Sequence, residues 1–503
     1  MRQPIRLGMM VVAAALVFSA CSSATTTPTP APTATPAPPA SATAAANTSA
    51  PTATPTPVIY TGPKVTITWF CCLGTGEDAS QQAVEKQVVA DFNAAHPNIN
   101  LVFELNPYTG ARDKLSTELA SGNGPDVVGP VGVGGSEAFH GQWADLAPWI
   151  TKYNYDLSEF DQSAIDFYKQ GGEGQIGLPF AVYPSELYYQ KAMFDEAGLE
   201  YPPAKYGDKY TMPDGSVVDW NYDTVRKVAM MLTIDKSGCD ATQSCFDPKN
   251  VVQYGFEPQR DDLRGLGAYF GAGQLLGSDG KTAQIPADWA YGWKWAYNGI
   301  WTDHFIETNS VYQSTAFNGG GYTFNSGKVA MQENFLWNVC CITNAGRNWD
   351  LAALPSNPNT GKVTATFNAD TFRVLKSSKN QEAAFIVLTY LLGEGSQKLL
   401  NAYSGFPARK SLQADFFTQL EKQTDPTTGK PVFPAKVNWA VAIDGIKYAD
   451  VPNMEAYMPA YNATLDRLQT SLTRWTSTGG LNMDTEISSL QSDIQKIWDK
   501  AGQ

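Results

Sequence analysis

The 503-residue sequence predicts an α/β fold, in which helices cover a parallel sheet. Between residues 64 and 128, segments with alternating β-branched and aromatic residues take turns with segments whose apolar residues recur every three to four positions. Ligands of such sheets bind beyond the carboxyl ends of the strands. We therefore expect the loops after Phe70 and after Val128 to contribute to a functional site.

The first αβ region predicts three strands and two helices in strict alternation. Val84, Val88 and Phe92 recur at four-residue spacing, and Pro97 ends the helix that they define. The expected strands are residues 64–70, 100–105 and a short one from 126 to 128, and the expected helices are 79–96 and 112–121.

A second αβ region follows, with a Trp-rich helix over 286–300. Trp289, Trp293, Tyr297 and Ile300 share one face of this helix and predict core packing, whereas Trp295 lies off that face and is expected to point outward. The other expected elements are strands at 187–190 and 328–332 and helices at 191–198, 223–233, 380–392, 454–472 and 485–501.

Composition excludes two classes of protein. The net charge is −13 and the chain has no cluster of Lys and Arg, whereas nucleic-acid binding needs a basic surface. No apolar run reaches the ~20 residues that span a bilayer, so the sequence does not predict an integral membrane protein.

The N-terminus predicts export and anchoring. Residues 1–20 combine Arg2 and Arg6 with an apolar run, as secretory signals do, and the small residues before Cys21 resemble a bacterial lipobox. Phe18 departs from that pattern, and ordinary secretion is the alternative. Residues 22–57 are almost entirely Thr, Ala, Pro and Ser, which predicts an extended tether. We expect a lipoprotein on the outer face of the cytoplasmic membrane.

Beyond the N-terminal region, four stretches in order resemble the extracellular solute-binding proteins of family 1, the sugar-binding subunits of bacterial ABC importers. They are LASGNGPDVV (119–128), GLPFAVYPSELYYQKAMFDEAG (177–198), FNSGKVAMQENFLW (324–337) and the stretch 370–409 with its terminal GFPAR. Gln190 stands where the family usually has Asn.

The resemblance implies a periplasmic-binding-protein-like fold, with two αβ lobes joined by crossover strands and a ligand cleft between them. Lobe 1 would take residues 60–180 and 352–412, and lobe 2 residues 183–350 and 414–503. Leu178–Ala181 and Leu354–Pro355 would be crossover strands. We expect a monomer without a cofactor that closes on a sugar by hinge motion and delivers it to a membrane permease.

The resemblance also implies site residues. Trp337 stands where the family places a stacking Trp, with a core position as the alternative, and Tyr183 lies in an expected loop beside the hinge. Trp69 ends the first strand and could equally be core. Asp370 enters the late crossover region, and Arg409 of GFPAR is a weaker candidate.

The loops at the strand ends supply further candidates. Glu77 and Asp78 follow the first strand, where they could bind hydroxyls or cap the next helix. Gly129–Ser136 is rich in glycine where family members often carry acids, which suggests contacts from the backbone or from Ser136.

Six cysteines besides Cys21 suggest disulfides in an exported protein. Cys239 and Cys245 share one polar loop and are expected to pair. The family geometry puts Cys71-Cys72 and Cys340-Cys341 in opposite lobes at the cleft, where a bridge between lobes would prevent opening. We therefore expect two vicinal disulfides that line the pocket. The three His residues are scattered and no CxxC spacing occurs, so no metal site is expected.

Three functions compete. The leading one is a non-enzymatic carrier of a neutral mono- or oligosaccharide. The second keeps the fold but binds a polyamine or a peptide, and the third is a secreted glycosidase that would use acids such as Glu77, Asp78 or Asp370.

Overall fold

A computed structural model describes residues 59–503 except 78, 133–134, 136, 171, 261, 318–322, 341, 343–347, 404, 423, 425–428, 432, 435 and 503. The expected signal segment, Cys21 and the tether lie outside the described residues. The described residues belong to one compact unit. Among them, no helix combines the length and the apolar character that crossing a bilayer requires.

Nine of the described strands form one sheet, in which β2, β1, β3, β13, β6, β11, β10 and β9 follow one another and β12 also pairs with β6. The strands are β1 (Val65–Cys71), β2 (Ile99–Leu105), β3 (Val127–Val131), β6 (Leu178–Gln190), β9 (Ile234–Asp235), β10 (Val251–Glu257), β11 (Val329–Phe335), β12 (Trp349–Ala352) and β13 (Phe367–Val374). Two short hairpins complete the strands: β4 (Lys169–Gln170) with β5 (Gly174–Gln175), and β7 (Lys209–Thr211) with β8 (Val217–Asp219).

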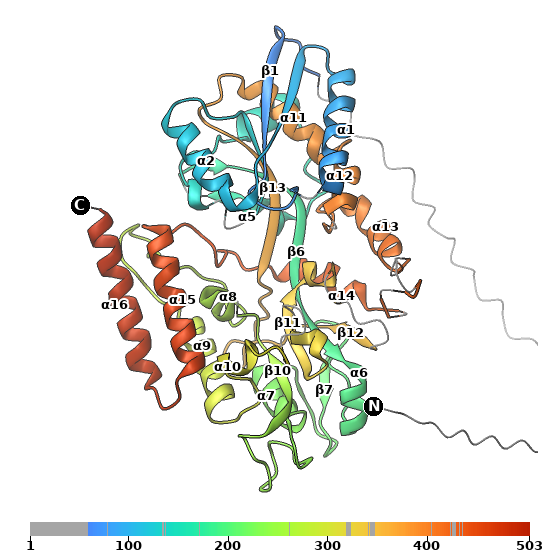
Figure 1. The fold of residues 1–503 in the computed structure, drawn as a ribbon, viewed down its shortest axis with the longest axis vertical. Helices are drawn as coiled ribbons and strands as arrows, with labels where there is room; N and C mark the ends of the chain where they lie inside the picture. Colours follow the sequence, from blue (N-terminus) through green and yellow to red (C-terminus); the bar gives the residue numbers. More distant parts are fainter. Residues whose placement is uncertain are drawn as a thin grey trace, which may run out of the picture. The chain divides into compact units, whose positions relative to one another are not determined.

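Strand β6 connects the two halves of this sheet (Figure 1). Its residues up to Pro184 pair with β13, and those from Ser185 onward pair with β11 and β12. The sequence predicted two separate segments with Tyr183 in a loop between them, and this was wrong. All thirteen residues of β6 are buried, and pairing with three strands keeps the segment extended despite its prolines.

The second crossing strand also differs from the prediction. Leu354 and Pro355 follow the end of β12 and belong to no strand, while β13 runs beside β6 instead. Strands β1, β3 and β6 run in one direction, and β13, β11 and β10 run in the other. The carboxyl ends of β1 and β3 therefore face the carboxyl ends of β10 and β11.

Helices cover both halves of the sheet. Helices α1 and α11 pack on β1, β2 and β13, with α12 against α1, whereas α7 packs on β10 and α6 on β12 (Figure 1). The helices are α1 (Ala79–Ala95), α2 (Tyr108–Ala120), α4 (Ala147–Tyr153), α5 (Gln162–Phe167), α6 (Lys191–Ala197), α7 (Tyr222–Met231), α8 (Leu263–Ala268), α9 (Ala287–Trp301), α10 (Asn309–Tyr312), α11 (Gln381–Leu392), α12 (Ser396–Tyr403), α13 (Lys410–Leu420), α14 (Trp439–Gly445), α15 (Tyr461–Ser477) and α16 (Met483–Ala501). Single 3-10 turns are η1 (Glu137–Phe139), η2 (Thr323–Ser326), η3 (Leu336–Cys340) and η4 (Ile446–Tyr448).

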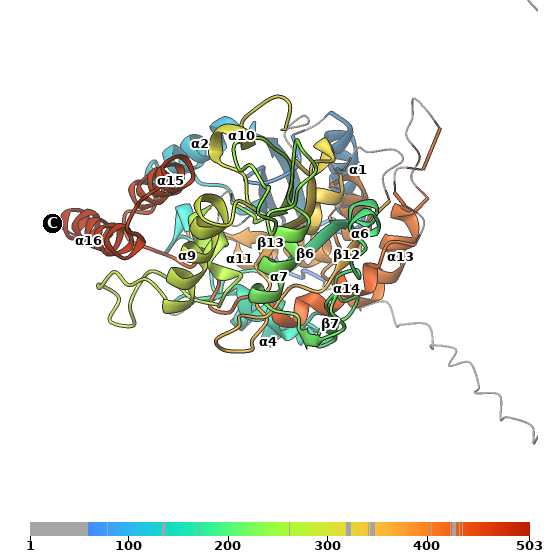
Figure 2. The same cartoon turned by 90° about the horizontal axis from the view of Figure 1, so that it is seen from below.

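Local sequence signals explain several helix ends. The Asn221 side chain accepts a hydrogen bond from the Thr224 backbone N–H at the start of α7, and Gly198 ends α6 in the left-handed conformation, as its position predicted. The helix expected at 454–472 instead begins at Tyr461, because residues 450–460 form an irregular segment that lines the site described below. Helices α15 and α16 lie side by side (Figure 2).

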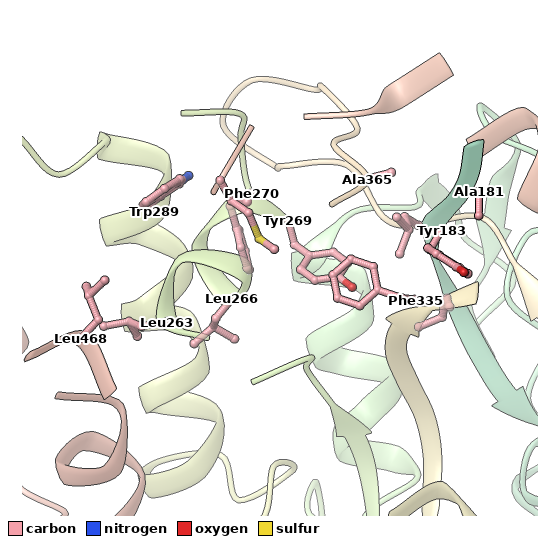
Figure 3. Close-up of a cluster of buried hydrophobic side chains, with 14 of the residues drawn as sticks. Ala181, Tyr183, Leu263, Leu266, Tyr269, Phe270, Trp289, Phe335, Ala365 and Leu468 are labelled. Carbon is pink, nitrogen blue, oxygen red and sulfur yellow. The ribbon is translucent and has the colours of Figure 1, made fainter. Parts of the chain in front are cut away.

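The Trp-rich helix α9 packs as predicted on one face and not on the other. Trp289 and Trp293 are fully buried beside α8 and α15, where Leu266 and Leu468 also lie (Figure 3). Trp295 was expected to point outward, but only 7% of it is exposed and its indole N–H donates to the Tyr222 carbonyl. Another helix and the sheet cover this face of α9. The spacing of apolar residues within α9 alone does not reveal such contacts with other elements.

Candidate ligand pocket

A pocket of about 420 Å³ lies where strands from both halves of the sheet end. Leu73–Thr75 follow β1, Gly132 follows β3, Gln259 and Asp262 follow β10, and Trp337 follows β11. Tyr183 and Asp370 enter from the two strands that run between the halves, β6 and β13. Its volume falls in the range of small-molecule sites, roughly 300–1,000 Å³.

Aromatic rings form one wall of the pocket. The rings of Phe335 and Trp337 stack with centroids 4.2 Å apart, and Tyr183 meets Trp337 edge to face at 5.4 Å. Figure 3 shows Tyr183 and Phe335 on neighbouring strands, and both are almost fully buried. Trp337 is only partly buried, so its ring remains available to a ligand.

Three carboxyl groups also line the pocket: those of Asp262, Asp370 and Glu455. Arg264 binds Asp262 through Nε at 3.0 Å and Nη2 at 2.8 Å, so that charge is paired. Burial raises the pKa of Asp370 to about 7. Burial also raises the pKa of Glu455 to about 8, although the nearby Arg264 opposes the increase. Near neutral pH these two carboxyl groups can therefore donate as well as accept hydrogen bonds.

The carboxyl group of Asp370 lies close to the backbone of Gly132, where a side chain would crowd it. A Cβ atom at Gly132 would lie 3.0 Å from Oδ1 of Asp370, so a larger residue would push this carboxyl group away from the pocket wall. None of the described residues that line the pocket is Lys, Arg or His. The described walls of the pocket therefore present aromatic faces and hydrogen-bonding groups but no cationic side chain.

Tyr403 connects the pocket to a buried carboxyl group behind it. Its hydroxyl donates to Oε1 of Glu85 at 2.6 Å, and this oxygen also lies 3.6 Å from Sγ of Cys71. Burial raises the pKa of Glu85 to about 7, and the hydrogen bond from Tyr403 opposes that increase. Glu85 thereby holds one of the side chains that line the pocket.

The structure brings together some of the residues that the sequence suggested and separates others. Tyr183, Trp337 and Asp370 line the pocket. Trp69 is instead fully buried: its indole N–H donates to the Gly129 carbonyl at 2.6 Å, and its ring packs against Phe103 and Phe372. From its position on β1, Trp69 points into the helix-covered core. A core position was the alternative that the sequence left open for it.

The vicinal cysteines lie behind the pocket. The sulfurs of Cys71 and Cys72 are bonded to each other, but both residues are fully buried and neither is part of the pocket wall. Together with Glu85 they form a group in which the two sulfurs and one carboxylate oxygen, all atoms that can bind metals, lie within 4.8 Å of one another. Because the two sulfurs are joined, they offer no thiolates to a metal ion. Leu73–Thr75, rather than a disulfide, line the pocket here.

The remaining suggested residues lie elsewhere. Arg409 is buried outside this pocket, where it donates to the Leu392 carbonyl and to the Tyr155 hydroxyl, both at 2.7 Å. Glu77 is exposed and is not part of the pocket wall. Asp78, Ser136, Cys341 and the side chain of Cys340 lie outside the described part of the chain. Cys239 and Cys245 form the expected disulfide.

Several lining residues were missed from the sequence. Gln259 and Asp262 follow β10, whose sequence VVQYGFE carries the β-branched and aromatic residues of a strand and could have been recognised. Glu455 was assigned to a helix, and Asn368 and Tyr403 carried no signal of their own.

A pocket at converging strand ends that is lined by aromatic rings and carboxyl groups is typical of a binding site for a small polar molecule. The chain belongs to the family of bacterial extracellular solute-binding proteins, whose sequence model matches residues 87–427. Members of this family are binding proteins.

Individual relatives agree with this assignment. A protein of Brucella abortus (strain 2308) that is named as a binding protein is 24% identical over 343 residues, which are 64% of this chain and 71% of the relative. The fold is similar to that of the sugar-binding protein MalE from Xanthomonas citri, with a TM-score of 0.64, 17% identity and coverage of 87% of this chain and 98% of the other. It is also similar to the ABC substrate-binding protein Lmo0181 from Listeria monocytogenes in complex with cycloalternan, with a TM-score of 0.57, 18% identity and coverage of 86% and 98%.

Proposed function

We propose that this protein captures a neutral mono- or oligosaccharide in the pocket between β1, β3, β10 and β11 and delivers it to the permease of an ABC importer. The observation that carries the proposal is that the aromatic rings of Tyr183, Phe335 and Trp337 line the same pocket as a set of carboxyl and amide groups. A sugar ring has an apolar face that stacks on aromatic rings and a rim of hydroxyls that exchanges hydrogen bonds with such groups. The names of MalE and of the cycloalternan-bound protein support the same ligand class.

A polyamine is the second candidate, because three carboxyl groups converge in the pocket. Charge favours the neutral ligand. Asp262 is already paired with Arg264, and the raised pKa values of Asp370 and Glu455 leave a large part of each protonated near neutral pH. Protonated carboxyl groups attract a cation weakly but bind hydroxyl groups well.

A thermal-shift screen of the purified protein separates these ligands. Neutral mono-, di- and trisaccharides form one half of the panel, and putrescine, spermidine and short peptides form the other. At about 100 times its Kd, a ligand adds about 2.7 kcal/mol to the unfolding free energy and raises the melting temperature. The proposal predicts a shift with at least one saccharide, and a shift with amines or peptides alone contradicts it.

We infer that binding involves no catalysis. A glycosidase would need two cleft acids in the roles of acid and of base or nucleophile. Arg264 holds Asp262 as an ion pair, and the aromatic wall and hydrogen-bonding groups suit reversible capture. Overnight incubation with each oligosaccharide followed by chromatography should return it unchanged, and release of shorter products would identify an enzyme.

We also propose that the halves of the sheet act as two lobes that close on the ligand about β6 and β13. Lobe 1 takes residues 60–180 and 352–412, and lobe 2 takes residues 183–350 and 414–503. Small-angle scattering should give a smaller radius of gyration for the monomeric protein after saturation with sugar. An unchanged scattering curve at saturation would contradict closure.

Export and anchoring complete the proposal. The signal segment 1–20 would be removed, Cys21 would carry the lipid, and residues 22–57 would hold the binding unit away from the membrane. Mass spectrometry of the mature N-terminus would give an acylated Cys21 peptide. An unmodified Cys21, or an uncleaved leader, would contradict this part of the proposal.

A further inference from the structure

A second pocket of about 510 Å³ adjoins the ligand pocket. Its described walls come from η1, the end of α5 and β4, the Gln274–Leu276 loop, Arg373 of β13 and the segment 451–457. Glu455 is the one described residue that lines both pockets. The irregular segment that precedes α15 thus lies between the two spaces, with Met454 on one side and Tyr457 on the other.

The second pocket has an aromatic platform of its own. The rings of Tyr457 and His140 stack with centroids 3.6 Å apart and planes 13° from parallel. Nδ1 of His140 lies 2.9 Å from Oε1 of Glu173, whose two oxygens also accept the backbone N–H of Gly141. The ring that supports Tyr457 is therefore fixed from behind, and Tyr457 itself is only partly buried.

Polar side chains surround this platform. Asp166, Lys169, Gln274 and Asn453 line the pocket together with the ring of Phe167. They supply donors, acceptors and both signs of charge around an apolar face. The first pocket has no Lys, Arg or His among its described lining residues, so the two pockets differ in charge, but an aromatic face with hydrogen-bonding groups around it suits a second sugar ring.

Glu455 stands at the junction with an incomplete set of hydrogen bonds. Its Oε2 is buried and has no hydrogen-bond partner among the described residues. A buried carboxyl oxygen without a partner destabilises the protein, and a ligand hydroxyl placed at the junction would supply the missing hydrogen bond. The unmet oxygen therefore marks a position that a ligand passing between the pockets would occupy.

We propose that the two pockets form one continuous site and that the physiological ligand is an oligosaccharide, with one ring against Trp337, another on Tyr457 and hydroxyls of the connecting region on Glu455. This inference rests on the proposed function, because it names the length of the saccharide that the same site takes. A monosaccharide fills the first pocket and leaves Tyr457 uncovered.

Calorimetric titration of four proteins with a matched mono-, di- and trisaccharide series tests the inference. Wild type should bind the trisaccharide at least about tenfold more tightly than the monosaccharide. Tyr457→Ala should lose about tenfold in trisaccharide affinity and keep monosaccharide affinity within about twofold. Tyr457→Phe retains the ring and should bind both as wild type does. Tyr201→Ala removes a tyrosine that is 40% exposed and lines neither pocket, and should change nothing.

The outcomes separate this inference from the proposed function. Equal affinity of wild type for the whole series, or a Tyr457→Ala variant that binds every sugar within about twofold of wild type, overturns the continuous site and leaves sugar binding intact. Wild-type protein that binds no saccharide overturns both. A circular dichroism melt of each variant identifies any that fails to fold, and Lys169→Ala then takes the place of Tyr457→Ala.

Discussion

Tyr183 and Trp337 meet edge to face, with ring centroids 5.4 Å apart, at the point where the two halves of the sheet join. Tyr183 belongs to β6, which crosses between the halves, whereas Trp337 follows β11 in the second half. The contact therefore connects the strand that would bend on closure to the ring that would cover a sugar. A ligand that stacks on Trp337 would therefore act on β6 through the contact between Trp337 and Tyr183.

Asp370 tests the role of the pocket carboxyl groups. Asp370→Ala should weaken saccharide binding at least about tenfold, because it removes a hydrogen-bonding group from the pocket wall. Asp370→Asn keeps a donor and an acceptor in the same space and should lose less. Isothermal titration at pH 7 measures both, and an Ala variant that binds as wild type does would remove Asp370 from the site.

The buried carboxyl group of Glu186 should make the unfolding free energy of the protein depend on pH. This residue of β6 is fully buried, neither carboxyl oxygen has a hydrogen-bond partner among the described residues, and burial raises its pKa well above 4.5. Above pH 4.5 the unfolded chain releases a proton that the folded chain retains, so stability falls as the pH rises toward the raised pKa. The slope for one proton is about 1.4 kcal/mol per pH unit.

Glu186→Gln removes that proton while keeping the shape of the side chain. The unfolding free energies of variant and wild type, measured in urea, should be similar near pH ~4, and the variant should gain about 1.4 kcal/mol relative to wild type per pH unit above ~5. A difference between the two proteins that stays constant from pH ~5 to ~8 would show that Glu186 is ionised in the folded state.

The hydrogen bond from Tyr403 to Glu85 should contribute to stability. Tyr403→Phe removes the hydroxyl that the buried Glu85 accepts, at a cost of about 1–3 kcal/mol of unfolding free energy. Tyr153→Phe is the matched control, because Tyr153 also donates to a glutamate, Glu382, but that side chain is 32% exposed. We expect the control to cost less than about 1 kcal/mol. Equal losses would indicate that burial of Glu85 does not matter.

The cysteine pairs predict a specific peptide map. Digestion without reduction should join Cys239 to Cys245 and leave Cys71-Cys72 as an internal pair within one peptide. A crosslink between the peptides that contain Cys71-Cys72 and Cys340-Cys341 would contradict both this pairing and hinge motion. Removing the Cys239–Cys245 bridge by a double Ser substitution should cost about 2 kcal/mol, since its loop is short.

The sequence predicted the strands and helices whose signals are local. Val84, Val88 and Phe92 define α1 by spacing, and Gly198 ends α6 by its left-handed conformation. It failed at β6, because Pro179 and Pro184 suggest an interruption that pairing with β13, β11 and β12 overrides. It also failed for Trp295, whose burial depends on contacts from distant segments, such as those with Tyr222 and Phe256.

The candidate site was predicted best where the family resemblance marked it. Trp337 and Asp370 lie in two of the stretches that resemble the family, and both line the pocket, whereas Glu77, which was suggested by the end of the first strand, does not. Glu455 comes from an irregular segment far along the chain, and no local pattern places it beside Gln259. Such residues meet only through the topology of the whole sheet.

Calorimetric titration of wild type and Trp337→Ala with the saccharide that gives the largest thermal shift tests the central claim most directly. Wild type should bind one saccharide per chain, and Trp337→Ala should bind it at least about tenfold more weakly, because the stacking ring is gone. Trp149→Ala, which removes a partly buried tryptophan of α4 outside the pocket, should bind as wild type does. Equal affinity of wild type and Trp337→Ala would contradict the claim that this pocket holds the sugar.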